Sequence, residues 1–100
     1  MGTTATNQGL TDAEARACVE ASLPGWCVED SRLRRVFEFE DFGAAMAFMV
    51  EVAFHAERLC HHPNWSNVYG RVEVSLWSHD LGCISTKCVE LARAMNDAAQ

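Results

Sequence analysis

The chain has few basic residues, and they form no cluster. Lysine and arginine number 8 against 14 aspartates and glutamates in 100 residues, which gives a formal net charge of −6. Arg34 and Arg35 are the only adjacent basic pair. Because proteins that bind a phosphate backbone carry a basic stripe or patch, this composition argues against direct binding of nucleic acid.

Long apolar runs are also missing. No stretch approaches the roughly 20 apolar residues of a membrane-spanning helix. The start, MGTTATNQG, lacks a secretory hydrophobic region and the arginines of a transit peptide. Gly2 and Thr6 fit the loose myristoylation pattern, but no polybasic segment follows, and one acyl chain binds membranes weakly. We therefore predict a disordered tail over residues 1–9, no membrane anchor, and a cytoplasmic protein small enough to diffuse into nuclei.

The cysteines include no Cys-x-x-Cys pair. There are five, at positions 18, 27, 60, 83 and 88, and an odd number excludes a fully paired disulfide framework. Three of them fall at predicted helix positions that belong to the core, where a free cysteine behaves as a small hydrophobe. We predict reduced thiols and a reducing compartment.

What the chain does have is apolar content, at 49% of its residues. One hundred residues suffice for one globular domain, expected over 10–98, that buries roughly 65% of its unfolded surface. A core of that size is thin, which favours self-association.

Three helices are predicted from caps and apolar periodicity, over residues 11–22, 42–60 and 85–98. Thr11 and Glu14 form a capping box at the first start, and Asp41 and Ser85 are N-caps for the others. The residue before a proline is pushed toward extended geometry, so His62 is expected outside the second helix. The predicted apolar stripe of that helix is Ala45, Met46, Met49, Val52, Ala53, Ala56, Leu59 and Cys60.

Four strands are predicted over residues 26–28, 32–39, 65–69 and 71–78. In the second strand one face is formed by Leu33, Arg35, Phe37 and Phe39. Tyr69-Gly70 joins the last two strands into a hairpin. The order α-β-β-α-β-β-α predicts an α+β fold with a four-stranded antiparallel sheet and three helices packed on one face.

Three of the four histidines, His61, His62 and His79, fall at the ends of predicted elements. If the second hairpin runs beside the long helix, the three imidazoles converge, and imidazole exchanges protons near neutral pH. Two alternatives stay open at this point. The adjacent histidines could cap helix carbonyls, or Cys60 and the three histidines could bind zinc, although no standard zinc spacing is present.

Several motifs at their spacing add a resemblance to a known family. They are Leu23-Pro24-Gly25-Trp26, Phe37-x-Phe39-x-Asp41-Phe42, Glu57-x-x-x-His61-His62-Pro63, Tyr69-x-Arg71-Val72 and Ser78-His79-Asp80. From Leu10 to about Asp97 the chain resembles the pterin-4a-carbinolamine dehydratases, also known in animals as a dimerisation cofactor of a homeodomain transcription factor.

The resemblance implies dehydration of 4a-hydroxytetrahydrobiopterin to quinonoid dihydropterin, in tetrahydrobiopterin recycling, without metal or other cofactor. The family's catalytic histidines fall on His61, His62 and His79. Glu57 is expected to hold a histidine tautomer or contact the substrate, with a solvated helix carboxylate as the alternative.

Further substrate-binding positions are expected around these histidines. They are Pro63, Trp65, Trp77, Ser78 and Cys88. The two tryptophans are either walls for a flat ring or ordinary packing residues. Cys88 stands where the family usually has an aspartate, and a thiol cannot replace the pull of that anion on an imidazolium.

The resemblance also implies partners. A homodimer or homotetramer is expected, and the alternative function is a non-catalytic dimerisation cofactor of a transcription factor. Intact His61, His62 and His79 favour the enzyme, since a scaffold does not require them.

Overall fold

A computed structural model of the chain describes residues 6–100. Its elements are α1 Asp12–Ser22, β1 Cys27–Glu29, β2 Arg32–Glu38, α2 Phe42–Leu59, β3 Asn64–Val68, β4 Arg71–Leu76 and α3 Thr86–Ala98. This confirms the predicted order and fold class. The position of the myristoylation pattern at Gly2 lies outside the described residues.

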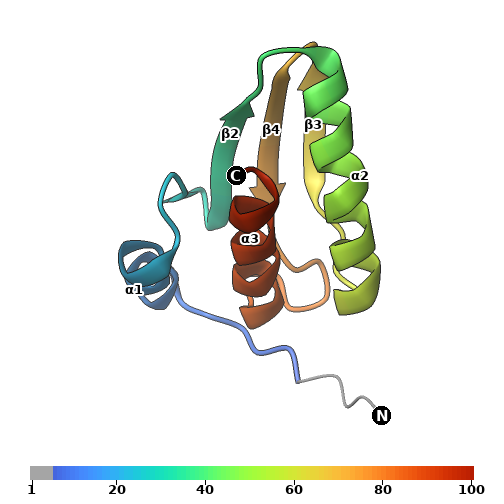
Figure 1. Cartoon of the computed structure of the whole chain (residues 1–100). Helices are drawn as coiled ribbons and strands as arrows, with labels where there is room; N and C mark the ends of the chain where they lie inside the picture. Colours follow the sequence, from blue (N-terminus) through green and yellow to red (C-terminus); the bar gives the residue numbers. More distant parts are fainter. Residues whose placement is uncertain (1–5) are drawn as a thin grey trace.

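The four strands form one antiparallel sheet in the order β1-β2-β4-β3. Leu33 of β2 stands opposite Leu76 of β4, and Val68 of β3 stands opposite Arg71 across the hairpin turn. In Figure 1, α2 and α3 lie side by side over one face of the sheet. Helix α1 contacts β1 and α3. Because of the strand order, β1 and β3 are the edges of the sheet.

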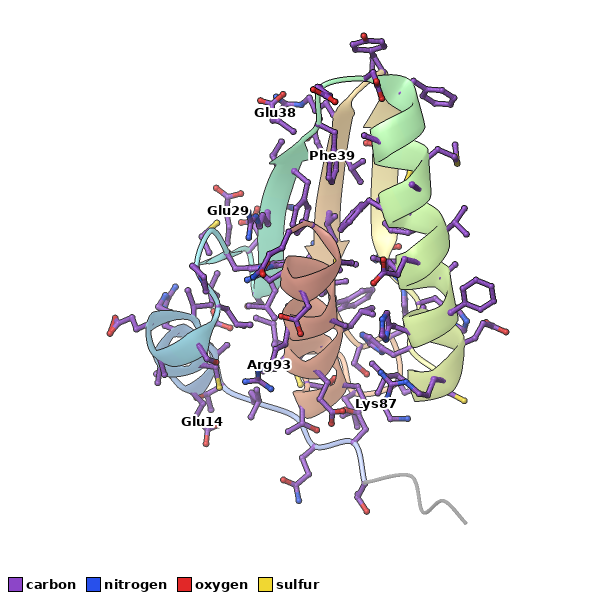
Figure 2. All side chains as sticks on the ribbon, viewed as in Figure 1. Glu14, Glu29, Glu38, Phe39, Lys87 and Arg93 are labelled. Atoms are coloured by element: carbon purple, nitrogen blue, oxygen red, sulfur yellow. The ribbon has the colours of Figure 1, made fainter. Side chains whose placement is uncertain are left out.

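The core fills the space between the helices and this face of the sheet. Phe37 of β2 and Phe48 of α2 have ring centroids 4.7 Å apart, and Phe39, labelled in Figure 2, lies 5.0 Å from Phe48. Leu33 and Phe37 are buried, as the alternation predicts. Arg35 turns to the same side, where its guanidinium lies 4.3 Å from the Phe37 ring.

The predicted apolar stripe of α2 is correct in part. Ala45, Val52, Ala56 and Leu59 are buried, and so is Phe48, which the prediction left out. Met46, Ala53 and Cys60 are exposed, contrary to the prediction. The buried residues define one face at about 100° per residue, and Met46 and Ala53 lie beside it.

Helix α2 ends one residue earlier than predicted, at a left-handed residue. Cys60 has φ +53°, and its N–H donates to the carbonyls of Ala56 and Glu57. The N–H of His61 also donates to Ala56 O, at 3.0 Å. This is the pattern of a Schellman C-cap, and it turns the Cys60 side chain outward. His62 lies outside the helix, as predicted.

Strand β4 ends two residues before the predicted end at 78. Ser78 leaves the ladder with β2 and pairs with Cys83 across a tight loop. The Ser78 N–H donates to Cys83 O at 2.9 Å, and Gly82 N–H donates to Ser78 O at 2.8 Å. His79 therefore belongs to this loop, whereas the prediction made it the final residue of the hairpin.

Part of the predicted tail lies against the start of α3. Gly9 bridges Ser85, and the Thr86 N–H donates to Gln8 O at 2.8 Å. The Asn7 side chain accepts a hydrogen bond from the Lys87 N–H at 3.0 Å. The first turn of a helix leaves N–H groups without intrahelical partners, and this segment supplies acceptors for them. In the described part of the chain, the helices are too short or too polar to cross a membrane.

Candidate active site

Four elements meet at one end of the sheet. There α2 and β4 end and β3 and α3 begin, as Figure 1 shows. They enclose a pocket of about 360 Å³. Its walls are Asn7, Cys60, His61, His62, Pro63, Asn64, Trp77, Ser78, His79, Asp80 and Lys87. The topology thus brings the three sequence-predicted histidines to one pocket.

A hollow of similar volume, about 380 Å³, lies on the sheet face away from the helices. Its side chains include Arg34, Asn64, Glu73 and Ser75, and it has no histidine or cysteine. The pocket at the end of the sheet has far more groups that can exchange protons near neutral pH, so it is the candidate active site.

His61 forms the buried wall of the pocket and is only 9% exposed. Its Nε2 lies 3.2 Å from Cys88 Sγ. Burial lowers the pKa of the imidazole, and the positive charges of Lys87, His62 and His79 lower it further, while Asp80 acts in the opposite direction. The neutral ring is therefore favoured over the imidazolium.

His62 stands on the solvent side of the same pocket. Its Nε2 lies 2.6 Å from Glu57 Oε2, in the last turn of α2. With the carboxylate as acceptor, Nε2 carries a proton, and in the neutral ring Nδ1 keeps its lone pair. Glu57 is thus placed to fix the tautomer of His62, which is one of the two roles expected for it; it is not among the residues that line the pocket.

His79 approaches from the loop after β4. Its ring lies 4.2 Å from that of Trp77, with the two planes at 64°. The guanidinium of Arg32 also lies over the Trp77 ring, 4.7 Å from its centroid. The loop itself is held by Ser78, whose buried hydroxyl accepts the Leu81 N–H at 3.2 Å.

The other predicted substrate-binding residues divide into three groups. Pro63, Trp77 and Ser78 line the pocket. Trp65 does not, because from β3 it packs against the core. Cys88 is fully buried beneath His61, away from the lining, and burial raises the pKa of its thiol.

Sequence reasoning missed three lining residues, Asn7, Asn64 and Lys87. Lys87 follows the Ser85 cap by two residues, and Figure 2 shows it at the start of α3, toward the end of α2. Its position in the first turn of a predicted helix could have indicated that Lys87 lies near the histidines. No sequence feature indicated a role for Asn7, since it lies in a polar segment without periodicity.

The five cysteines are free, as predicted. Among residues 6–100, no three histidine, cysteine, aspartate or glutamate side chains are arranged to hold a metal ion. Cys60, the fourth ligand of the zinc alternative, is held in its left-handed conformation by the C-cap of α2.

Comparison with known proteins agrees with this geometry. A family model described as "Pterin 4 alpha carbinolamine dehydratase" matches residues 8–98. A Synechococcus protein assigned as a pterin-4-alpha-carbinolamine dehydratase is 51% identical over 87 residues, covering 87% of this chain and 94% of the relative. A Novosphingobium aromaticivorans protein with the same assignment is 49% identical over 88 residues, covering 86% of this chain and 91% of the relative.

A solved structure is similar over nearly the whole fold. It is a Brucella melitensis protein described as a transcriptional coactivator/pterin dehydratase. The TM-score is 0.88 at 38% identity, covering 92% of this chain and 99% of the other.

Proposed function

This chain belongs to the pterin 4 alpha carbinolamine dehydratase family and is a hydro-lyase, and from that premise we propose that it converts 4a-hydroxytetrahydrobiopterin to quinonoid dihydropterin and water. Histidines supply the acid–base catalysis in this proposal, and the reaction serves tetrahydrobiopterin recycling in the cytoplasm. The protein can also enter nuclei because it is small.

The chemistry asks little more than proton transfer and orientation. The leaving hydroxyl is on a ring carbon bonded to a ring nitrogen, whose lone pair helps to break the carbon–oxygen bond. The departing oxygen takes one proton and leaves as water, and the ring nitrogen gives up one proton as the double bond forms. One group that donates a proton, another that accepts one and a cavity that holds the bicycle are sufficient.

The single observation that carries the proposal is the presence of three imidazoles around one pocket. His61, His62 and His79 come from the end of α2 and from the loop after β4. Glu57 orients His62, and Trp77 supports His79. We assign proton donation and acceptance to His61 and His62, and substrate orientation to His79.

The substrate side of the pocket is polar on one wall and aromatic on another. Asn64, Ser78 and Lys87 offer hydrogen-bonding groups, and Trp77 offers a ring. Such a combination suits a flat heterocycle with polar edges. Pro63 shapes the wall next to His62.

The test is a dehydratase assay with chemically generated 4a-hydroxytetrahydrobiopterin. His62→Ala and His79→Ala are suitable variants because both side chains are exposed and their loss leaves the core intact. We expect kcat to fall by about 10²-fold or more in His62→Ala, the scale of acid–base catalysis. His55→Ala is the matched control, since His55 lies on α2 outside the pocket and, within residues 6–100, its ring hydrogen-bonds only with Arg58. Unchanged rates in both site variants would refute the histidine mechanism.

A second candidate function is the dimerisation cofactor of a transcription factor. Two observations favour it: the coactivator description of the Brucella relative and an exposed apolar surface on α2. This surface, the α2 ridge, consists of Phe42, Met46, Val50 and Phe54 at four-residue spacing, with Phe54 74% exposed. A single apolar residue on a surface is normal, but a continuous ridge favours association.

The α2 ridge also supports the proposed homodimer or homotetramer, together with the exposed edge strand β3. The oligomeric mass of Phe54→Glu, measured by light scattering, tests whether the ridge serves association. If the ridge serves only association, the variant loses mass and keeps dehydratase activity. If mass is unchanged, association depends on another surface.

A further inference from the structure

Cys88 is a buried group in contact with one of the candidate catalytic histidines, His61. It lies in the first turn of α3 with no exposed surface. Its Sγ is 3.2 Å from His61 Nε2 and 3.3 Å from Ser85 Oγ. The thiol therefore connects the N-cap of α3 with the imidazole that forms the buried wall of the pocket.

The donor in each hydrogen bond between Ser85, Cys88 and His61 can be assigned by counting the available protons and acceptors. Ser85 Oγ accepts from the Cys88 N–H, and in the described part of the chain its own hydroxyl proton has Cys88 Sγ as its only hydrogen-bond acceptor. If Ser85 donates to the sulfur, the thiol proton is free to go to His61 Nε2. In the reverse order, Nε2–H donates to the sulfur and S–H to Ser85, which leaves a fully buried hydroxyl proton unpaired. In a third order, Nε2–H and the Ser85 hydroxyl both donate to the sulfur, which leaves the buried thiol proton unpaired. The first order is the only one that gives each buried proton an acceptor, and a buried donor without an acceptor is costly.

The favoured order is thus Ser85 O–H to Cys88 S–H to His61 Nε2. With Nε2 as an acceptor, the neutral ring carries its proton on Nδ1. Nδ1 has no hydrogen-bond partner among residues 6–100, and His61 lines the pocket. Nδ1–H is therefore the group that His61 offers to a bound molecule.

We propose that Cys88 is a positioning residue that holds His61 as a neutral imidazole with its proton on Nδ1, making His61 a hydrogen-bond donor to the leaving oxygen of the pterin. This rests on the proposed function for the identity of the substrate. A neutral imidazole can polarise or stabilise an oxygen without being an imidazolium. His61 then stabilises the leaving oxygen and does not protonate it, so His62 carries both proton transfers of the assignment above. Its Nδ1 takes the proton from the ring nitrogen, and the resulting imidazolium gives a proton to the departing oxygen, which leaves as water.

The surrounding charges agree with a neutral ring. Facing His61 are Lys87 from α3, His79 and Asp80 from the loop after β4, and the adjacent His62. All but Asp80 disfavour a positive charge on His61, and burial acts in the same direction. The thiol proton needed for the bond to Nε2 is retained because burial raises the pKa of Cys88.

The direct test is ¹⁵N NMR of the histidine side chains in the wild-type protein at pH 7. We expect Nδ1 of His61 to show the shift of a protonated nitrogen and Nε2 that of an unprotonated one. The reverse tautomer, or protonation of both nitrogens, would overturn the proposal. Because this readout needs no substrate, it is independent of the dehydratase assay.

Variants at position 88 give the second test. Cys88→Ser keeps a donor toward Nε2 and should retain both the tautomer and a kcat within about threefold of wild type, whereas Cys88→Ala should give mixed tautomers and a kcat about tenfold lower with little change in KM. Cys88→Asp should raise the His61 pKa by pairing a carboxylate with the ring, so the doubly protonated imidazolium should persist to a higher pH than in wild type. Cys83→Ala, in the neighbouring loop, is the control that should leave the His61 titration unchanged. Identical His61 titrations in wild type, Cys88→Ala and Cys88→Asp would contradict the proposal, and the wild-type spectrum decides it even if a variant fails to fold.

Discussion

Glu57 holds His62 through a 2.6 Å contact between Oε2 and Nε2, although both side chains are largely exposed, at 76% and 66%. An exposed pair of this kind contributes little to stability, because water and salt compete for both groups. Its geometry instead fixes the tautomer of His62, because Nε2 is bonded to the carboxylate, and we propose that Nδ1 is the nitrogen that meets the substrate.

The first prediction follows from this pair. Glu57→Gln should lower kcat by about tenfold, the scale for losing a partner that orients a histidine. Its Tm should stay within a few degrees of wild type, since exposed substitutions change stability by about 0.5 kcal/mol or less. Steady-state kinetics and thermal unfolding measure both. Glu51→Gln, an exposed carboxylate on the same helix, is the control. A variant with full activity would show that Glu57 is only a solvated helix residue.

Trp77 lines the pocket and Trp65 packs against the core, so substitutions at the two positions should have different effects. Trp77→Leu removes the edge contact to His79 and should lower kcat/KM by about tenfold, which corresponds to ~1.4 kcal/mol. Trp65→Leu should leave kcat/KM nearly unchanged and lower the free energy of unfolding by ~1–3 kcal/mol, because Trp65 packs against the core. Kinetics and urea unfolding on both proteins provide the comparison. The opposite pattern would place the substrate against Trp65.

The elements of the fold could be predicted because each has a local cause. Thr11 and Glu14 make the predicted capping box, with bonds of 3.1 and 2.9 Å, and Asp41 caps α2 through Ala44 N–H at 2.8 Å. Leu33 and Phe37 face the core because side chains alternate along a strand. These features depend on neighbours a few residues away, so the sequence contains the information.

Most of what sequence reasoning missed depends on distant contacts. The exception is the left-handed conformation of Cys60 in the C-cap of α2, which is local but which a cysteine does not predict, because residues other than glycine rarely adopt it. The contact of Cys88 with His61 joins residues 27 positions apart. Asn7 reaches the pocket only because its segment satisfies N–H groups of α3. No periodicity or spacing encodes these arrangements, so the site could be predicted as a set of histidines but not as a geometry.

The pKa of His61 gives a prediction for stability against pH. Because burial lowers this pKa, the unfolded chain binds a proton at His61 more readily than the folded protein. The contribution of His61 is constant above its unfolded pKa of ~6.5 and is lost as pH falls below that value through the folded pKa. Urea unfolding between pH 7.5 and 5 should therefore show a smaller pH-dependent loss in His61→Asn than in wild type. Parallel curves for the two proteins would show that His61 protonates equally in both states.

A polar cluster joins α3 to the sheet and to the loop before β1. Asn96 Oδ1 accepts from Trp26 Nε1 at 2.8 Å and from Arg35 at 2.6 Å, and Asn96 Nδ2 donates to Pro24 O at 3.1 Å. Asn96→Leu leaves the buried indole N–H without its acceptor, so we expect a loss of ~1–3 kcal/mol in the free energy of unfolding. Glu90→Ala, at an exposed position of α3, is the control and should change stability by about 0.5 kcal/mol or less. Equal stabilities of the two variants would mean that water replaces the amide.

The hairpin turn at Gly70 has no room for a larger residue. A Cβ at this position would overlap the backbone oxygen of Phe39, and Phe39 N–H donates to Gly70 O at 2.7 Å, so neither strand connection can move without breaking that bond. We expect Gly70→Ala to lower the Tm by several degrees, about 4–8 °C for each kcal/mol lost in a domain of this size. Gly43→Ala is the matched change, because its Cβ would have an ordinary contact with the Asp41 side chain, and alanine at a compatible position loses less chain entropy on folding than glycine, worth about 0.4–1 kcal/mol. Thermal unfolding should therefore move the two variants in opposite directions. Since the turn lies at the opposite end of β4 from the pocket, kcat at a temperature where both are folded should stay at the wild-type value, and a joint loss of Tm and kcat in Gly70→Ala would show that the two ends of the sheet are coupled.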